Sequence, residues 1–240
     1  MSESTKKLYG NYKVFHPNDK LMFYCDKKRY NWYLERNLAK VISDKCIKLT
    51  FEPNGFGEDG IFLTPRENRC VVSGNNIELT KHHVIPYQYR KHFPVEYKSR
   101  NANDVVALHV DIHYDYEKYA DILKAELIKK HITTKELTYN ISINSVIKYQ
   151  KTLEKYKDNI PKDKTLLMEG NIQGNLSELN MSLDEVMNAE PIDFSELIVE
   201  REGIERLIII WKTHFTEYAK PKFLPDWWDK NYIKIVNNNT

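Results

Sequence analysis

The chain has 240 residues, of which 41% are hydrophobic and 29% are charged, and its formal net charge is +2. This composition is typical of a soluble globular protein, with room for one large domain or a core domain with a helical extension. So small a net charge does not by itself indicate nucleic-acid binding. No apolar run reaches membrane-spanning length, and the N-terminus lacks a signal-peptide hydrophobic region. Because the three cysteines are scattered, we expect no disulfide framework and an intracellular protein of the cytoplasm or nucleus.

The first third of the chain reads as a small α+β unit. Residues 1–19 are polar and predict a tail or an edge segment. A strand is expected at Leu21–Tyr24, and Asp26 can cap a helix that runs to about Ile42. Alternating apolar and polar residues predict a further strand at Ile47–Phe51. After a turn at Pro53, short strands are expected at Gly60–Leu63, Arg69–Val72 and Ile77–Thr80, with residues 73–76 as a hairpin turn.

From Val105 onward the pattern turns from strand to helix. The apolar run Val105–Leu108 precedes Asp111, a candidate N-cap for a helix that ends near His131. Tyr116, Ala120, Leu123 and Leu127 share one face of that helix. Further helices are expected at Ser142–Lys157, Lys162–Ile172, Ser182–Asn188, Asp193–Glu202 and Ile204–Ala219, followed by an aromatic tail that packs back on the body. The chain is therefore predicted to be α+β, with a polar tail at 1–19, a mixed domain at 20–131 and a helical region at 132–240.

The stretch from Cys70 to Leu127 holds five of the eight histidines and the residues best suited to chemistry. Adjacent His82 and His83 at a strand end point to opposite faces, so one can face a metal and the other a water. His113 lies in the first turn of the following helix, and Glu117 lies one turn further on the same face. Imidazole and carboxylate together suit Mg, Mn, Zn or Ni, so the residues do not select the ion.

The spacing of these residues resembles the HNH, or ββα-metal, nuclease motif. It reads Cys70 and Gly74, then the HHVIP step, then Asp104 with its apolar run, then His113 nine residues later. The segments YCDKKRYNWYLERNLAKVI, IKLTFEPNGFG, NRCVVSG, KHHVIPYQYRKHFP and NDVVALHVDIH are also similar to the region that trails the exonuclease domain in the exonuclease 3′–5′ domain-containing family. The resemblance covers most of the 240 residues and does not extend to the exonuclease domain itself.

This resemblance implies an HNH-like ββα module and a role for each matching position. His83 matches the general base, and Asp104 stands where the family places an Asn that orients the base. His82 and His113 match the metal-binding positions, and Glu117 occupies the place of a further ligand in some members. The two cysteine pairs that often hold a structural zinc correspond here to Cys70, Ser73, His109 and Ile112. Only two of these four can bind zinc, so a structural zinc is not expected.

Basic and aromatic residues surround the histidines. Five cations could contact phosphates around the site or could instead belong to a solvated loop, namely Lys81, Arg90, Lys91, Lys98 and Arg100. Tyr87, Tyr89, Phe93 and Tyr97 alternate with them and could stack on unpaired bases, although we expect these rings to pack in the core.

The sequence supports two classes of function. The first is a metal-dependent endonuclease that hydrolyses phosphodiester bonds in DNA or RNA. The second is an HNH fold that has lost catalysis and serves as a nucleic-acid-binding or scaffold protein. A weaker third possibility is an adaptor that binds a protein partner through the helical region. No membrane association is expected.

Overall fold

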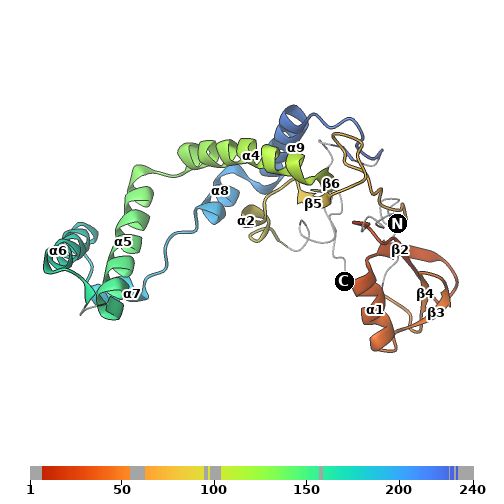
Figure 1. Ribbon diagram of the computed structural model, residues 1–240, viewed down its shortest axis with the longest axis horizontal. Coiled ribbons are helices and arrows are strands. Elements are labelled where there is room, and N and C mark those ends of the chain that lie inside the picture. Colours follow the sequence, from red (N-terminus) through yellow and green to blue (C-terminus); the bar gives the residue numbers. More distant parts are fainter. Residues whose placement is uncertain are drawn as a thin grey trace. The chain divides into compact units, whose positions relative to one another are not determined.

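The structure is a computed structural model that describes residues 7–54, 63–94, 97, 104–156, 159–226, 228–229 and 231. It divides into two compact units. The first contains the described residues up to Leu123 together with those from Gly203 onward, and the second runs from Lys124 to Glu202 (Figure 1). The first unit holds both small sheets, whereas the second is helical. Among the described helices, none is long and apolar enough to cross a membrane.

The second unit consists of the end of α4 (Val110–His131) and four further helices, which are α5 (Thr134–Tyr156), α6 (Lys162–Leu179), α7 (Leu183–Asn188) and α8 (Phe194–Glu202). Its core is formed by Ile143, Val146, Ile172 and Val186. A capping box between Ser182 and Glu185 begins α7, where the sequence predicts the helix to start.

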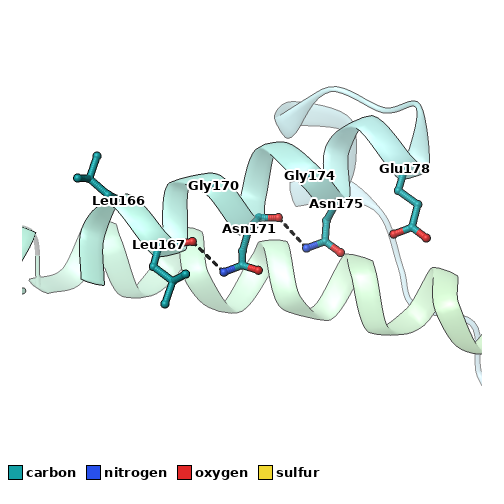
Figure 2. Close-up of a pocket in the computed structure, with 7 residues that line it drawn as sticks. All are labelled: Leu166, Leu167, Gly170, Asn171, Gly174, Asn175 and Glu178. Carbon is teal, nitrogen blue, oxygen red and sulfur yellow. Dashed lines mark hydrogen bonds between the residues drawn. The ribbon is translucent and has the colours of Figure 1, made fainter. Parts of the chain in front are cut away.

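Helix α6 is longer than the sequence predicts, since it continues beyond Ile172 and through Gly174 to Leu179. A Cβ atom on Gly170 or Gly174 would meet nothing within 4 Å, so neither position needs a glycine for packing. Both line a shallow hollow with Leu167 and Asn171, and the Asn171 side chain donates to the Leu167 carbonyl at 2.8 Å (Figure 2). The helix ends at Asn180, whose left-handed backbone turns the chain.

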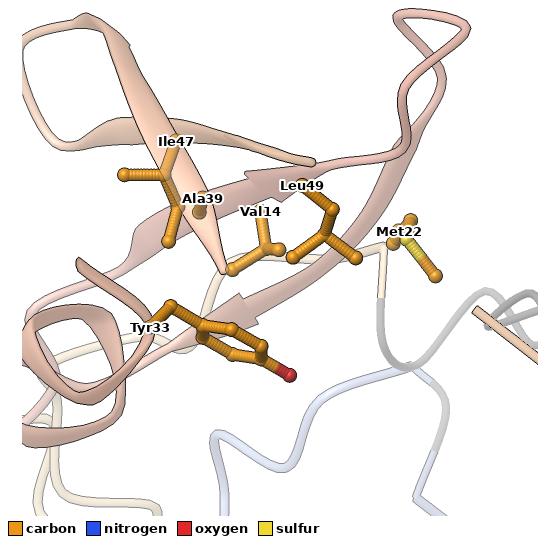
Figure 3. Close-up of a cluster of buried hydrophobic side chains, with 6 residues drawn as sticks. All are labelled: Val14, Met22, Tyr33, Ala39, Ile47 and Leu49. Carbon is orange, nitrogen blue, oxygen red and sulfur yellow. The ribbon is translucent and has the colours of Figure 1, made fainter. Parts of the chain in front are cut away.

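A four-stranded sheet forms the N-terminal part of the first unit. Its order is β2-β1-β4-β3, made of β1 (Tyr12–Phe15), β2 (Leu21–Cys25), β3 (Ala39–Ser43) and β4 (Cys46–Leu49). Strand β1 runs antiparallel to β2 and parallel to β4. The core joins the sheet to α1 (Lys27–Glu35) through Val14, Met22, Tyr33, Ala39, Ile47 and Leu49 (Figure 3). Residues 12–15, which the sequence places in a tail or an edge segment, thus lie between two other strands.

Helix α1 begins as predicted and ends earlier than predicted. The Asp26 side chain accepts a hydrogen bond from the Arg29 amide at 2.8 Å and caps the helix. Asn37 then adopts a left-handed conformation with φ of 56°, and the Leu38 amide donates to the Tyr33 carbonyl. The prediction of helix up to Ile42 is therefore wrong. The apolar residues beyond Asn37 pair with β4 instead, which satisfies their backbone groups in the sheet.

The second sheet is a two-stranded hairpin of β5 (Leu79–His83) and β6 (Val105–His109). Helix α4 follows β6 directly, and the short helix α2 (Tyr87–Arg90) lies between the strands in sequence. Helix α9 (Ile204–Ala219) buries Leu207, Ile208, Trp211 and Phe215 in the same unit. The predicted strand Arg69–Val72 is wrong, because these residues form a turn. Of the predicted strand Gly60–Leu63, residues 60–62 lie outside the described residues and Leu63 lies in a turn.

Candidate metal centre and catalytic pair

The β5–β6 hairpin and α4 together position the histidines. His82 pairs with Val106 and His83 with Val105 across the antiparallel ladder. Because side chains alternate along a strand, His82 is buried with 3% of its surface exposed, whereas the His83 side chain is 43% exposed. Helix α4 starts at Val110, whose amide donates to the Glu78 carbonyl next to β5. The helix therefore starts beside the hairpin, and His113 lies in its first turns.

His82, His113 and Glu117 converge on one point. One ligand atom from each residue lies within 4.8 Å of the other two. Glu117 Oε1 is 3.5 Å from His82 Nδ1 and 3.4 Å from His113 Nε2. These separations exceed an ordinary N–H···O hydrogen bond of about 2.9 Å. They match the spacing of about 3.4 Å between two ligands that hold a metal tetrahedrally at roughly 2.1 Å. Among the described residues, this is the group of side chains that could hold a metal ion.

Aromatic rings fix the orientation of the His82 ring. Phe215 of α9 stacks on it with a centroid distance of 5.5 Å and an interplanar angle of 21°. Tyr116 of α4 meets it edge-on at 5.0 Å. Burial, and then the charge of Glu117, raise the pKa of Tyr116, so this hydroxyl stays protonated and can donate to His214 Nδ1 at 3.0 Å. These ring contacts hold the His82 imidazole with its Nδ1 facing Glu117.

His83 and Asp104 form a second pair beside this group. Asp104 Oδ2 lies 3.5 Å from His83 Nδ1 and 3.6 Å from Arg90 Nε. The Asp104 carbonyl accepts a hydrogen bond from the Val84 amide at 2.7 Å, which anchors the residue to the chain just after His83. The Asp104 side chain is 7% exposed. An imidazole with one nitrogen facing a carboxylate and the other directed elsewhere is the arrangement of an oriented general base.

Two further cations, Arg66 and Lys212, lie within electrostatic range of Asp104, and no sequence motif marks either of them. Burial lowers the pKa of Arg66 and of Lys212, and the charge of Asp104 works against that shift in both. Lys212 is 3% exposed on α9 and donates to the Asp229 carbonyl at 3.1 Å. A lysine inside a predicted amphipathic helix reads as a solvated residue, so only the fold identifies it as a buried neighbour of the candidate site.

The basic residues assigned to phosphate contacts are only partly described. Lys81 and Lys91 are exposed, and the Lys81 ammonium lies 5.4 Å from the centre of the Tyr9 ring. Arg90 is half-buried against Asp104. Lys98 and Arg100 lie outside the described residues.

Three of the aromatic residues interleaved with these cations, Tyr87, Tyr89 and Phe93, differ in burial. Tyr89 and Phe93 are buried, at 0% and 3% exposure, so the expectation of core packing is confirmed for them. It is wrong for Tyr87, which is 71% exposed. Burial also raises the pKa of Tyr89 to about 12.

The four positions that correspond to zinc ligands are held by other contacts. Cys70 is fully buried, and the Ser73 amide donates to its sulfur at 3.5 Å. Burial alone would raise the pKa of the Cys70 thiol, but hydrogen bonds from Ser73 and from the His109 and Val72 backbone lower it overall. Ser73 is exposed and Ile112 is half-buried. His109 Nδ1 accepts the Asp111 amide at 3.3 Å, so His109 acts at the start of α4 where the sequence predicts Asp111 as the cap.

The loop after Cys70 is further braced by the C-terminal segment. The amides of Lys222 and Phe223 both donate to the Val71 carbonyl, at 2.8 and 2.9 Å. The Phe223 ring packs on Gly74, whose φ of 78° suits a residue without a side chain. Packing and backbone hydrogen bonds thus hold this loop.

The chain is similar to proteins named "Exonuclease 3′-5′ domain-containing protein 2" from Homo sapiens, Mus musculus and Drosophila melanogaster. It is 27% identical to each, over 263, 262 and 261 residues, and the matches cover 95% of this chain. They cover 41%, 39% and 44% of those proteins, so the chain spans less than half the length of these curated relatives. These matches confirm the similarity to the exonuclease 3′–5′ domain-containing proteins that the motifs indicate.

A further relative is "Protein RRP6-like 3" of Arabidopsis thaliana, which is 37% identical over 111 residues. That match covers 44% of this chain and 12% of the plant protein. No protein-family model and no solved structure matches the chain.

Proposed function

We propose that this protein is an HNH-type, metal-dependent endonuclease that hydrolyses phosphodiester bonds in nucleic acid. The observation that carries the proposal is the convergence of His82, His113 and Glu117 beside the His83–Asp104 pair. The similarity to proteins named for an exonuclease domain supports nucleic acid as the substrate. We assign the catalytic module to residues 20–131, with α9 packed against it.

The side chains present suit a divalent ion. His82 would use Nδ1 and His113 would use Nε2, because these are the nitrogens that face Glu117. Two imidazoles and a carboxylate bind Mg, Mn, Zn or Ni, and three protein ligands leave positions open for substrate and water. A bound ion would stabilise the negative charge that develops on the scissile phosphate.

The protein's own residues supply the proton transfer. With Nδ1 of His83 facing Asp104, its Nε2 is the nitrogen that takes a proton from the attacking water. A hydrogen bond from Nδ1 to Asp104, formed when this 3.5 Å separation shortens on substrate binding, would hold the ring in the tautomer that leaves Nε2 unprotonated. Arg90 faces the same Asp104 oxygen and keeps that carboxylate in place. Lys81 and Lys91, with Lys98 and Arg100, would contact phosphates on either side of the cleaved bond.

Replacing His83 with alanine tests this mechanism. The side chain is half-exposed, so we expect His83→Ala to fold and to bind metal like the unchanged protein. Cleavage of labelled DNA and RNA should fall by at least roughly 100-fold, the lower end of what a positioned general base contributes. Calorimetry with the candidate ions checks that the metal site is intact. Cleavage that survives in His83→Ala at the original rate would refute the proposed role.

A second candidate function follows from the zinc positions, of which only Cys70 and His109 keep a ligand side chain. A module that has lost these ligands could retain nucleic-acid binding without hydrolysis. In that case Arg90→Gln and Lys91→Gln would weaken binding, while no candidate ion would support cleavage by the unchanged chain.

A further inference from the structure

Tyr87 presents an aromatic face to solvent next to the proposed catalytic pair. It is 71% exposed, although Tyr89 two residues later and Val84 three residues earlier are buried. Pro86 precedes α2, and Tyr87 is the first residue of that helix. Since Ile85 and Tyr89 occupy the core side, the Tyr87 ring faces away from the core. An exposed ring of this kind adds nothing to core packing.

Arg90 links the Tyr87 ring to the catalytic pair. Its guanidinium carbon lies 5.9 Å from the centre of the Tyr87 ring. Its Nε donates to the Ile85 carbonyl at 2.8 Å and lies 3.6 Å from Asp104 Oδ2, the oxygen that faces His83. The cation is therefore held by two contacts besides the one with the ring. A ring on an anchored cation is partly pre-organised, which lowers the entropy cost of binding on it.

A flat aromatic face beside a cation and a proposed phosphodiester site matches one kind of ligand. Unpaired bases stack on tyrosine, and the phosphates between them are neutralised by arginine and lysine. Bases inside a duplex are stacked on their neighbours and offer no free face. We propose that Tyr87 stacks with an unpaired base next to the bond to be cleaved, so that the site takes single-stranded nucleic acid. This inference rests on the proposed function, because it names the substrate class of that site.

Another exposed tyrosine provides a matched control. Tyr156 of α5 is 45% exposed, and Lys155 lies 5.1 Å from the centre of its ring. It therefore has the same kind of tyrosine–cation pair, but it belongs to the other unit. Tyr156→Ala should leave nucleic-acid affinity unchanged.

Binding is measured on the full chain, in chelator, by fluorescence anisotropy with a labelled single strand of roughly 12 nucleotides and with a blunt-ended duplex of two separate strands. Loss of one stacked base weakens binding by about 5- to 150-fold, so we expect that loss of single-strand affinity for Tyr87→Ala. Tyr87→Phe should retain affinity, because it keeps the ring. Duplex affinity should not change. The dependence of single-strand affinity on salt should also stay the same, because no phosphate contact is removed.

Three results would overturn the inference. They are no single-strand binding by the unchanged protein, unchanged single-strand affinity in Tyr87→Ala, and an equal loss for single strand and duplex. Circular dichroism of Tyr87→Ala checks that the variant is folded. The binding assay needs no catalysis, so the two proposals fail separately. Stacking without cleavage refutes only the nuclease function, whereas cleavage that depends on His83 but not on Tyr87 refutes only the single-strand assignment.

Discussion

Replacing Glu117 with glutamine removes the one charged ligand of the candidate metal centre and keeps the size of the side chain. Glu117 Oε1 lies 3.5 Å from His82 Nδ1 and 3.4 Å from His113 Nε2. The side chain is 43% exposed, so without metal the free energy of unfolding should change by no more than about 0.5 kcal/mol. The effect should therefore appear only when an ion is bound.

The size of that effect follows from linkage between binding and folding. An ion present at about 100 times its dissociation constant stabilises the folded protein by about 2.7 kcal/mol. Even outer-shell changes weaken metal sites by about 10- to 100-fold, so we expect at least roughly a 100-fold loss for a direct ligand. At the same ion concentration the variant would then gain only about 0.4 kcal/mol. Metal-dependent stabilisation should thus fall by about 2.3 kcal/mol.

Urea denaturation with and without each candidate ion measures this difference, and calorimetry gives the affinities directly. Asp115→Asn is the matched control, because it removes the same charge from the same helix. The Asp115 carboxylate pairs with Lys118 at 2.8 Å and lies outside the metal-binding group. If the ions stabilise Glu117→Gln as much as the unchanged protein, Glu117 is not a ligand and the proposed centre is wrong.

Three further predictions concern the scaffold. Gly74→Ala should lower the free energy of unfolding by about 1–3 kcal/mol, because φ is 78° and the new Cβ would lie 2.9 Å from the Phe223 ring. Gly170→Ala in helix α6 should instead raise it by about 0.5–1 kcal/mol, because the new Cβ would meet nothing within 4 Å. Urea denaturation that gives both changes the same sign would contradict this. Hydrogen bonds from Arg201, and then from Thr133, lower the pKa of Glu136 to about 2 from an ordinary 4.5. The stabilisation by ionised Glu136 should therefore be complete above pH 4.5 and lost as the pH falls toward 2. The difference in free energy of unfolding between the unchanged protein and Glu136→Gln should shrink over that range. A difference that stays constant with pH would refute the lowered pKa of Glu136. Glu202→Gln should destabilise the second unit by about 2–3 kcal/mol in thermal and urea unfolding, because the buried carboxylate contacts Lys130 and His131 at 2.5 Å each. The exposed Glu154→Gln is the control. A loss of stability in Glu202→Gln no larger than in Glu154→Gln would exclude a structural role for Glu202.

The candidate metal ligands could be read from the sequence because they depend on local geometry. Adjacent residues on a strand face opposite sides, which separates His82 from His83. Residues four apart on a helix share a face, which brings His113 and Glu117 together. Both relations hold wherever the strand and the helix form, so residue spacing relates the two members of each pair, and the resemblance to the HNH motif joined the pairs into one predicted site. Helix α9 was predicted with its observed bounds for a similar reason, since one apolar stripe marks its length.

The residues that surround those side chains could not be predicted, because they come from distant parts of the chain. Phe215 and Lys212 reach the site from α9, although each is far along the chain from the residue it contacts, His82 and Asp104, and no local pattern marks a contact at that separation. Likewise, residues 39–43 continue a helical pattern but pair with β4, because strand pairing satisfies their backbone there. Tyr87 and Tyr89 have the same side chain in the same short helix, yet one is exposed and the other fully buried. Which face of α2 meets the core depends on packing between distant segments, and that packing placed Tyr87 in solvent beside Arg90.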